Sequence, residues 1–294
     1  MKTDEITILF VSYNSDEILL KNITKLKNFK IIIIDNFVNN KLLTKIKDFK
    51  NIKYLKNIKN LGEGEAASFG LNFVQTKFTL YLNPDTLIDE ANILQLNNVF
   101  LNYDNIGLVS PLHLDINMNF LGNYFAHPFT QRINRTKLEK LIFNKLDKVK
   151  PVGDLFVKSL WGAPLFFKTD FIKNIGFYDK NFFLYFEDVD LCDRVIQNKL
   201  RVVLTPSAFC YHLHEDLSSK SLSYLYFTSS NFIFSQIYYF KKNNKKIWKF
   251  YLRFFEYFIN SIIYLLKFNK NKSFKNIFRI CGIFKYFLFS LLKS

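Results

Sequence analysis

A short apolar run, 78–82, is followed by Asn83-Pro84-Asp85, which ends in a carboxylate. Asn-Pro-Asp is favourable β-turn chemistry, so Asp85 could simply complete a turn. A carboxylate at the end of a buried strand could also bind Mg²⁺ or Mn²⁺. These hard cations take one or two carboxylates and fill their other positions with phosphate oxygens and water. The motif alone leaves both interpretations open.

A second pair of carboxylates, Glu187 and Asp188, follows five consecutive aromatic or apolar residues, 182–186. At the exposed start of a helix, such a pair would only complement the helix dipole. A carboxylate walled by aromatic rings, with a like charge beside it, would instead have a raised pKa and accept protons better. The pair therefore predicts either a helix start or a general base.

Two histidines, His212 and His214, are separated by one residue and would share a face of a strand. A lone histidine is more often structural than a metal ligand, and imidazole suits Mn²⁺ less well than Zn²⁺. The adjacent pair strengthens the interpretation as ligands but does not establish it.

Several common enzyme classes lack their motifs here. Gly62, Gly64 and Gly70 flank the start of a predicted helix, but the strict G-x-G-x-x-G pattern is absent. Neither a G-x-x-x-x-G-K phosphate loop nor a G-x-S-x-G nucleophile motif occurs. The three cysteines include no C-x-x-C pair, which argues against a cysteine zinc site and a disulfide framework. Dehydrogenases, nucleotide hydrolases and serine hydrolases are therefore disfavoured.

The elements that must position these residues alternate between strands and helices. Apolar runs bounded by polar turn residues predict buried strands at 6–11, 31–34, 52–55 and 78–82. Helical spacing of apolar residues predicts helices at 16–26 and 65–74. This order predicts an α/β fold with a mostly parallel sheet and flanking helices.

Ligands of such sheets bind outside the carboxyl ends of the strands. The residues expected at those ends are Tyr13, Asn14, Asp35, Gly62 and Asp85. The second half of the chain has fewer clear strands. It predicts a basic helix around 136–146, a turn entering a strand at 161–167, a helix from Glu187 and a strand at 202–206.

The last 54 residues, Lys241–Ser294, differ in charge from the rest of the chain. They hold 13 Lys or Arg against one acid, Glu256, and so carry +12 of the total formal charge of +16. Fifteen aromatic residues fall in the same stretch. We therefore divide the chain into a globular domain, 1–240, and a basic, amphipathic helical tail, 241–294.

Apolar residues recur at helical spacing along this tail, at Ile277, Ile280, Cys281, Phe284, Phe287, Leu288 and Leu291. A helical pair packed on the globular domain would explain the stripe but not the charge. A helix lying in an anionic membrane surface explains both, and it is the interpretation we favour. Nucleic acid, the rival partner for a basic and aromatic segment, is not expected.

The motifs also occur in a specific order along the chain. Val11-Ser12-Tyr13-Asn14, Ile34-Asp35-Asn36, Asn60-Leu61-Gly62, Asn83-Pro84-Asp85, Trp161-Gly162-Ala163, Gly176-Phe177-Tyr178-Asp179 and Phe186-Glu187-Asp188-Val189-Asp190 follow one another. Over residues 6–242 this set resembles family 2 glycosyltransferases, and among them the rhamnosyltransferase-like members with NPD in place of the DXD motif.

The resemblance implies a GT-A fold, a nucleotide-sugar donor, Mg²⁺ or Mn²⁺, and inversion at the anomeric carbon. By matching position, Ser12, Tyr13 and Asp35 would hold the base and ribose, and Asn60 and Gly62 would line the nucleotide pocket. Asp85 would bind the metal, with Asn83 where many relatives have Asp, and His212 would complete the metal site. Asp188 matches the general base and Glu187 its acidic neighbour, while Trp161, Gly162 and Ala163 would form the floor between donor and acceptor.

The resulting expectation is an inverting, metal-dependent transferase that moves a rhamnose-like or other hexose from a dTDP- or UDP-linked donor. The acceptor would be a hydroxyl of a lipid-linked glycan or polysaccharide in bacterial surface glycan synthesis. The chain begins MKTDEITILF, without a visible signal peptide, so we expect a cytoplasmic protein on the inner face of the membrane. The donor-side residues 37–40 depart from the family pattern. A catalytically silent protein that binds sugar nucleotides, or a scaffold of the same fold, is therefore the alternative.

Overall fold

The computed structural model describes residues 2–37, 42–125, 150–213 and 221–292. Their contacts divide the chain into two compact units. The sheet unit is Met1–Lys180 with Glu187–His214, and the helical unit is Asn181–Phe186 with Glu215–Ser294. Two sequence features, the predicted basic helix around 136–146 and His214, lie outside the described residues.

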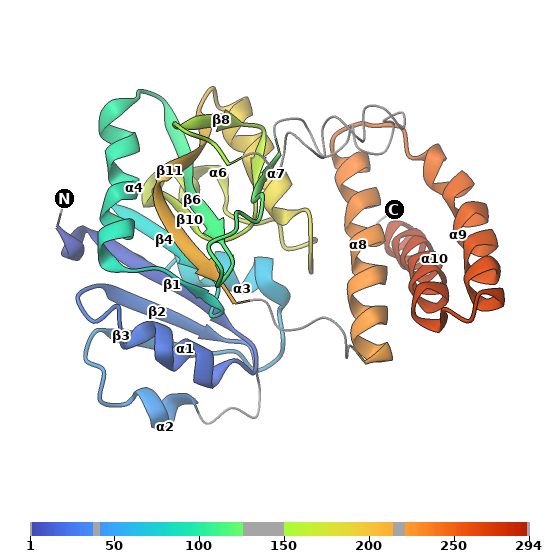
Figure 1. Cartoon of the computed structure of the whole chain (residues 1–294), viewed down its shortest axis with the longest axis horizontal. Helices are drawn as coiled ribbons and strands as arrows, with labels where there is room; N and C mark the ends of the chain where they lie inside the picture. Colours follow the sequence, from blue (N-terminus) through green and yellow to red (C-terminus); the bar gives the residue numbers. More distant parts are fainter. Residues whose placement is uncertain (1, 38–41, 126–149, 214–220, 293–294) are drawn as a thin grey trace. The chain divides into compact units, whose positions relative to one another are not determined.

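The first half of the sheet unit is parallel (Figure 1). Its strands are β1 (Ile6–Ser12), β2 (Lys30–Asp35), β3 (Ile52–Lys56) and β4 (Phe78–Leu82), in the order β3-β2-β1-β4. Helix α1 (Asp16–Ile23) connects β1 to β2, and α3 (Gly62–Leu71) connects β3 to β4. The carboxyl ends of these strands therefore share one edge.

The second half of the sheet mixes directions. Strand β10 (Leu165–Lys168) lies antiparallel between β4 and β6 (Ile106–Leu114), and β11 (Arg201–His212) runs parallel to β6. Two short strands, β5 (Thr86–Leu87) and β8 (Leu155–Val157), pair antiparallel with β11. The remaining elements are a 3-10 turn (Thr3–Glu5), α2 (Leu42–Ile46), α4 (Glu90–Asn102), β7 (Tyr124–Phe125), β9 (Ser159–Leu160), α6 (Thr169–Ile175) and α7 (Glu187–Gln197).

Alternation along the strands explains why the isoleucine run is needed. Ile31 and Ile33 join one buried cluster, whereas Ile32 and Ile34 join another on the opposite face of the sheet. A strand covered on both faces needs an apolar residue at every position, and a β-branched side chain suits the pleated surface. The predicted α/β fold with a mostly parallel sheet is confirmed.

Two predicted boundaries shift. Helix α3 begins at Gly62 and not at residue 65, because the Asn60 side-chain oxygen accepts the Gly62 N–H at 2.8 Å and satisfies a donor at the start of the helix. Gly62 also has a φ of 80°, which glycine adopts without strain. Strand β11 extends from Arg201 to His212, beyond the predicted 202–206, and so carries His212 to the sheet edge.

The described helices of the helical unit are α8 (Leu222–Lys242), α9 (Trp248–Leu266) and α10 (Lys270–Leu291). Helix α10 packs against both α8 and α9. At the crossing with α8, a Cβ on Gly282 would lie only 2.4 Å from the Ser230 carbonyl oxygen, so the two backbones meet closely. No helix in the described part of the chain is both long and apolar enough to cross a membrane.

The contacts group α8 with the two helices that follow it, whereas the sequence division at 240/241 leaves α8 with the globular domain. The physical reason is that the change in charge at Lys241 concerns exposed side chains, which do not decide how helices pack. The apolar and small residues that pack the helices together are also present along α8. The domain assignment itself stays a prediction.

Candidate active site

The carboxyl ends of β1 and β2 bring the predicted nucleotide-binding residues together. Ser12 and Asp35 are partners in the parallel register, and the Asn36 N–H donates to the Ser12 carbonyl at 2.8 Å. Tyr13 is 56% exposed, and its ring lies edge-on to Phe37 with centroids 5.3 Å apart. A buried polar pair thus lies beside an exposed tyrosine ring that packs on a half-buried phenylalanine.

Asp35 is fully buried and already accepts two hydrogen bonds. The Phe37 N–H donates to one carboxylate oxygen at 2.9 Å, and the Tyr54 hydroxyl donates to the other at 2.5 Å. Burial, together with the Asp35 charge, raises the pKa of Tyr54 far above its usual range. Tyr54 was not foreseen from the sequence, where it reads only as one residue of a short strand.

The loop before α3 is fixed by amide side chains. Asn60 is exposed, and its side-chain oxygen accepts the Gly62 N–H. The Asn36 amide donates to the Gly62 carbonyl at 2.9 Å. Asn57 in turn donates to the Asn36 side-chain oxygen at 2.7 Å. Gly62 is therefore tied to the end of β2. Asn36 and Asn57 are positioning residues that the motif analysis missed.

Asp85 and His212 meet at the same edge. Strand β5 pairs with the end of β11, the Leu213 N–H donates to the Asp85 carbonyl at 2.9 Å, and His212 Nε2 lies 3.3 Å from Asp85 Oδ2. The Thr86 N–H also bonds to the Asn83 carbonyl at 3.1 Å, so the motif is a turn as well. The two interpretations of Asn83-Pro84-Asp85 do not exclude each other.

Among the described residues, no group of three or more His, Cys, Asp or Glu is arranged to hold a metal. The Asp85 side chain is 42% exposed and that of His212 is 14% exposed. One carboxylate and one imidazole fit a hard cation that takes most of its oxygens from a diphosphate and water. The donor set thus fits Mg²⁺ or Mn²⁺ bound together with a nucleotide diphosphate.

Trp161 extends this cluster toward the centre of the site. The Trp161 and His212 rings have centroids 6.3 Å apart, and the buried His113 lies edge-on to both, at 5.4 and 5.8 Å. His113, on β6, was not singled out in the sequence. Its ring links the predicted floor residue to the predicted metal ligand.

Gly162 brings the floor against the candidate base. A Cβ on Gly162 would lie 3.7 Å from Asp188 Cβ and 3.6 Å from the Tyr178 hydroxyl oxygen. The Tyr178 hydroxyl donates to the Gly162 carbonyl at 2.7 Å. Ala163, the next residue, is buried and lies two residues before β10 begins. A larger residue at 162 would therefore fill the space next to Asp188.

Both predicted acids begin α7, and both have raised pKa values. Burial, opposed by the Val189 N–H bond and reinforced by the Glu63 charge, raises the pKa of Asp188 from 3.8 to about 6. Burial, with the charges of Asp188 and Glu63, raises the pKa of Glu187 well above its usual range. Glu187 Oε2 is buried and has no hydrogen-bond partner within the described ranges.

The sequence analysis missed Glu63, in the first turn of α3. The Tyr81 hydroxyl donates to it at 2.8 Å, which lowers its pKa, but burial outweighs this bond and the Asp85 charge also raises the pKa. Glu63 therefore interacts electrostatically with Asp85 on one side and with Asp188 on the other. An acid directly after Asn60-Leu61-Gly62 was the available signal.

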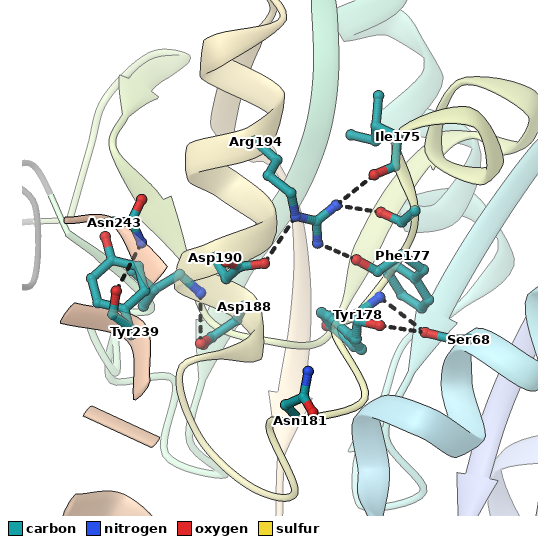
Figure 2. Close-up of polar contacts among 12 residues, drawn as sticks. Ser68, Ile175, Phe177, Tyr178, Asn181, Asp188, Asp190, Arg194, Tyr239 and Asn243 are labelled. Carbon is teal, nitrogen blue, oxygen red and sulfur yellow. Dashed lines mark hydrogen bonds and ion pairs between the residues drawn. The ribbon is translucent and has the colours of Figure 1, made fainter. Parts of the chain in front are cut away.

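Arg194 fixes the loop that carries Tyr178 (Figure 2). Its guanidinium bonds to Asp190 on the preceding turn of α7, with Nε 2.9 Å from Oδ2, and fans out to the carbonyls of residues 175–177. Ser68, on α3, makes two 3.0 Å hydrogen bonds to the Tyr178 backbone. Helices α3 and α7 thus hold Tyr178 against Gly162 and Asp188.

Comparison with known proteins agrees with this geometry. Residues 7–149 match the family described as Glycosyl transferase family 2. The low-salt glycan biosynthesis hexosyltransferase Agl10 of Haloferax volcanii is 21% identical over 204 residues, which cover 68% of this chain and 64% of that protein.

Two solved structures are similar in fold. GalNAc-T7 with UDP, GalNAc and Mn²⁺ has a TM-score of 0.53 at 15% identity, over 74% of this chain and 45% of that one. S. aureus TarS 1–349 with UDP-GlcNAc has a TM-score of 0.51 at 14% identity, over 79% and 66%. The chain thus matches less than two thirds of the length of each of these relatives. The sheet unit thus has a GT-A-like fold, and residues 7–149 are similar to family 2 glycosyltransferases.

Proposed function

We propose that the protein is an inverting, divalent-metal-dependent glycosyltransferase in which Asp188 is the general base. It would transfer a sugar from a nucleotide diphosphate donor to an acceptor hydroxyl. The observation that carries the proposal is the environment of Asp188. Its pKa is raised to about 6, and the floor residue Gly162 lies beside it. A base works best when its pKa lies near the working pH, because it is then both deprotonated and basic.

The donor would lie along the shared edge of the parallel strands. Ser12, Tyr13 and Asp35 would contact the base and ribose, with Asn60 and Gly62 beside them. Support comes from the exposed Tyr13 ring and from the free acceptor capacity of Asp35, since each carboxylate oxygen accepts more than one hydrogen bond. A pyrimidine N–H could therefore be added to the two bonds that Asp35 already accepts.

Asp85 and His212 would hold Mg²⁺ or Mn²⁺, with Asn83 at the neighbouring turn position. The bound cation would supply Lewis-acid neutralisation of the charge that develops on the leaving diphosphate. The solved GalNAc-T7 structure contains UDP and Mn²⁺, which favours this assignment. The 3.3 Å contact between His212 Nε2 and Asp85 Oδ2 supports a shared cation between these two side chains.

Asp188 would take the proton of the acceptor hydroxyl while that oxygen attacks the anomeric carbon. The new carbon–oxygen bond forms as the bond to the diphosphate breaks, and the electron pair of that bond leaves with the diphosphate. Attack opposite the leaving group inverts the anomeric carbon. General-base catalysis of this kind contributes typically ~10²–10⁴-fold. Trp161, Gly162 and Ala163 would form the floor, and Glu187, whose pKa is raised by burial, would lie beside the base as its acidic neighbour.

The sugar would be a hexose or a related sugar on UDP. The relatives are a hexosyltransferase and two proteins solved with UDP and GalNAc or with UDP-GlcNAc, which favours UDP over dTDP. The assignment to the rhamnosyltransferase-like subgroup rests only on Asn83-Pro84-Asp85, so a rhamnose-like sugar on dTDP is the less favoured form of the proposal.

The acceptor would be lipid-linked, because the helical unit has the surface of a membrane-binding module. The buried residues of helix α10 are mixed in character, with small or polar residues at three of five positions: Ser273, Asn276, Gly282, Ile283 and Tyr286. Its exposed large apolar side chains are Ile277, Phe284, Phe287, Leu288 and Leu291. A helix of a water-soluble bundle would bury the apolar stripe instead.

Helix α9 repeats this arrangement. Its buried residues are Phe250, Tyr257 and Ser261, whereas Leu252, Phe255, Phe258, Ile259, Leu265 and Leu266 are more than half exposed. Exposed apolar patches of this kind mark interaction surfaces. Together with the +12 charge of residues 241–294, they favour an anionic membrane, which attracts the basic side chains and accepts the apolar ones. We therefore propose a peripheral location on the inner face of the cell membrane.

Binding and release of nucleotides test the proposal. Thermal unfolding with UDP, dTDP, UDP-GlcNAc and UDP-Gal, each with and without Mn²⁺, should show a metal-dependent rise in Tm with the matching nucleotide. Slow metal-dependent release of nucleotide diphosphate from the donor should accompany it. A Tm rise without any release, for every donor and with membrane extracts as acceptors, would favour the silent sugar-nucleotide-binding alternative.

A further inference from the structure

The six residues before the candidate base group with the helical unit. Asn181–Phe186 belongs to that unit, although the chain on either side of it belongs to the sheet unit. In sequence, the segment ends one peptide bond before Glu187 and two before Asp188. The segment is therefore covalently continuous with the start of α7.

Helix α8 contacts the segment from end to end. The Ser235 hydroxyl donates to the Leu184 carbonyl at 2.9 Å, and the Asn181 amide donates to the Tyr238 hydroxyl at 3.0 Å. The Phe182 and Tyr238 rings are edge-on with centroids 4.9 Å apart. Ser235 is fully buried, so water does not compete for its hydrogen bond to Leu184.

The segment ends in an unfavourable turn. Tyr185 and Phe186 both have a φ of 70°, a left-handed conformation that aromatic residues rarely adopt. Such residues persist only where their surroundings hold them. Both rings contact Phe232 on α8, at 5.7 and 5.5 Å, and Phe186 also contacts Tyr239 at 5.6 Å. These ring contacts with the turn all come from α8.

We propose that α8 is a positioning element for Asp188, acting through the segment 181–186. Ser235 and Tyr238 anchor the segment, Phe232 holds its left-handed turn, and the turn is joined directly to Glu187 along the chain. This inference rests on the proposed function, in which Asp188 is the general base. It means that the helical unit contributes to the chemical step and does not only attach the enzyme to a surface.

The first experiment measures hydrogen exchange in the full-length protein and needs no substrate. The double variant Ser235→Ala/Tyr238→Phe removes both anchoring hydrogen bonds. Ser229→Ala is the matched control, because Ser229 is buried on the same helix and its hydroxyl has no hydrogen-bond partner within the described ranges. We expect amide exchange across 181–192 to rise about threefold or more in the double variant and to stay unchanged in the control.

The second experiment measures Mn²⁺-dependent hydrolysis of UDP-GlcNAc by the same proteins. A displaced base impairs only the reacting state, so kcat should fall about tenfold while the KM for UDP-GlcNAc stays within about twofold of the control. The pH midpoint of kcat should also shift, because the surroundings of Asp188 change. A loss of packing alone would lower Tm but would not lower kcat selectively while KM stays unchanged.

Two results would overturn the inference. One is exchange at 187–192 equal to that of Ser229→Ala. The other is a kcat within about twofold of that control although Asp188→Asn lowers hydrolysis by at least about 100-fold. In the latter case only the positioning role fails. Wild-type hydrolysis by Asp188→Asn itself would instead remove the proposed base and, with it, the function on which the inference rests.

Discussion

Burial raises the pKa of Asp188 from 3.8 to about 6, so the folded protein binds the proton of this carboxyl more tightly than the unfolded chain does. The ionised form therefore costs stability. The cost grows as pH rises from about 4 to about 6 and is complete at neutral pH, where a shift of two units corresponds to about 2–3 kcal/mol. A group kept for stability would not be buried in this way.

We expect Asp188→Asn to raise Tm at pH 7 and to lose that advantage as pH falls toward 4. The amide oxygen can still accept the Val189 N–H, so the start of α7 is kept. Thermal unfolding of both proteins at several pH values measures the difference. A difference in Tm that is independent of pH would mean that Asp188 is not held in a desolvated position.

The pH dependence of catalysis should report the same group. Because the base must be ionised, kcat for donor hydrolysis should fall about tenfold per pH unit below about pH 6. The Glu63 charge raises the pKa of Asp188, so Glu63→Gln should move the midpoint to lower pH. A pH profile recorded on both proteins checks this. A midpoint that stays in place would show that another group is titrating.

Asp85 should control metal-dependent nucleotide binding. In Asp85→Ala a hard cation would keep too few protein ligands, so the Mn²⁺-dependent part of UDP affinity should be lost. His212→Ala should weaken the same binding by less. Calorimetry with and without Mn²⁺ measures both, with Asp170→Asn as the control for loss of an exposed carboxylate. If Asp85→Ala binds UDP as the wild type does in Mn²⁺, Asp85 is only a turn residue.

At the scale of elements, the close crossing of α8 and α10 can be tested at a single glycine. A Cβ on Gly282 would meet the Ser230 carbonyl oxygen at 2.4 Å, and this backbone atom cannot move aside. We expect Gly282→Ala to lower the free energy of unfolding by about 1–3 kcal/mol despite the better helix propensity of alanine.

Gly153→Ala is the matched control, because a Cβ there meets nothing within 4 Å. Denaturant unfolding of both variants compares the two sites. Equal stability of Gly282→Ala and the wild type would contradict the close packing of the two helices.

The elements that could be predicted are those whose sequence pattern has only one physical solution. The isoleucine run at 31–34 has apolar side chains on both faces, so it must be a strand covered twice, and β2 confirms it. The acids at 187–190 mark a helix start, and α7 begins at Glu187. Boundaries set by single side chains, such as Asn60 at the start of α3, could not be found from periodicity.

The site was predictable where motifs end strands, and it was not where contacts cross the fold. Asp85 and His212 come together because β5 pairs with β11, and the family resemblance had predicted that these two residues share a site. Glu63 and Tyr54 were missed because their importance lies in partners from other elements, Tyr81 and Asp35. The inward face of α10 was also unexpected, since an apolar stripe normally predicts the buried side of a helix.

For the whole molecule, the exposed apolar face of the helical unit predicts membrane attachment by the intact chain. Removing residues 241–294 would uncover the face of α8 that packs on α10, so substitutions are the better test. Phe255, Ile259 and Leu266 are all exposed, so their replacement by Ser should reduce flotation with anionic vesicles while Tm stays unchanged.

Lys246→Glu/Lys249→Glu should weaken attachment mainly at low salt, because each basic side chain contributes about 1 kcal/mol near an anionic surface. Flotation at low and high salt, with anionic and then neutral lipid, separates the charge contribution from the apolar one. Wild-type protein that stays at the bottom of the gradient and sediments as a dimer would assign this face to a second copy of the chain.

The central claim is that the sheet unit transfers sugar with Asp188 as base. The most direct measurement is metal-dependent release of UDP from UDP-GlcNAc by the wild type and by Asp188→Asn, with UDP affinity measured in parallel. We predict that the variant binds UDP and Mn²⁺ as the wild type does but releases UDP at least about 100-fold more slowly. Release within a few-fold of the wild-type rate, with binding intact, would contradict the claim.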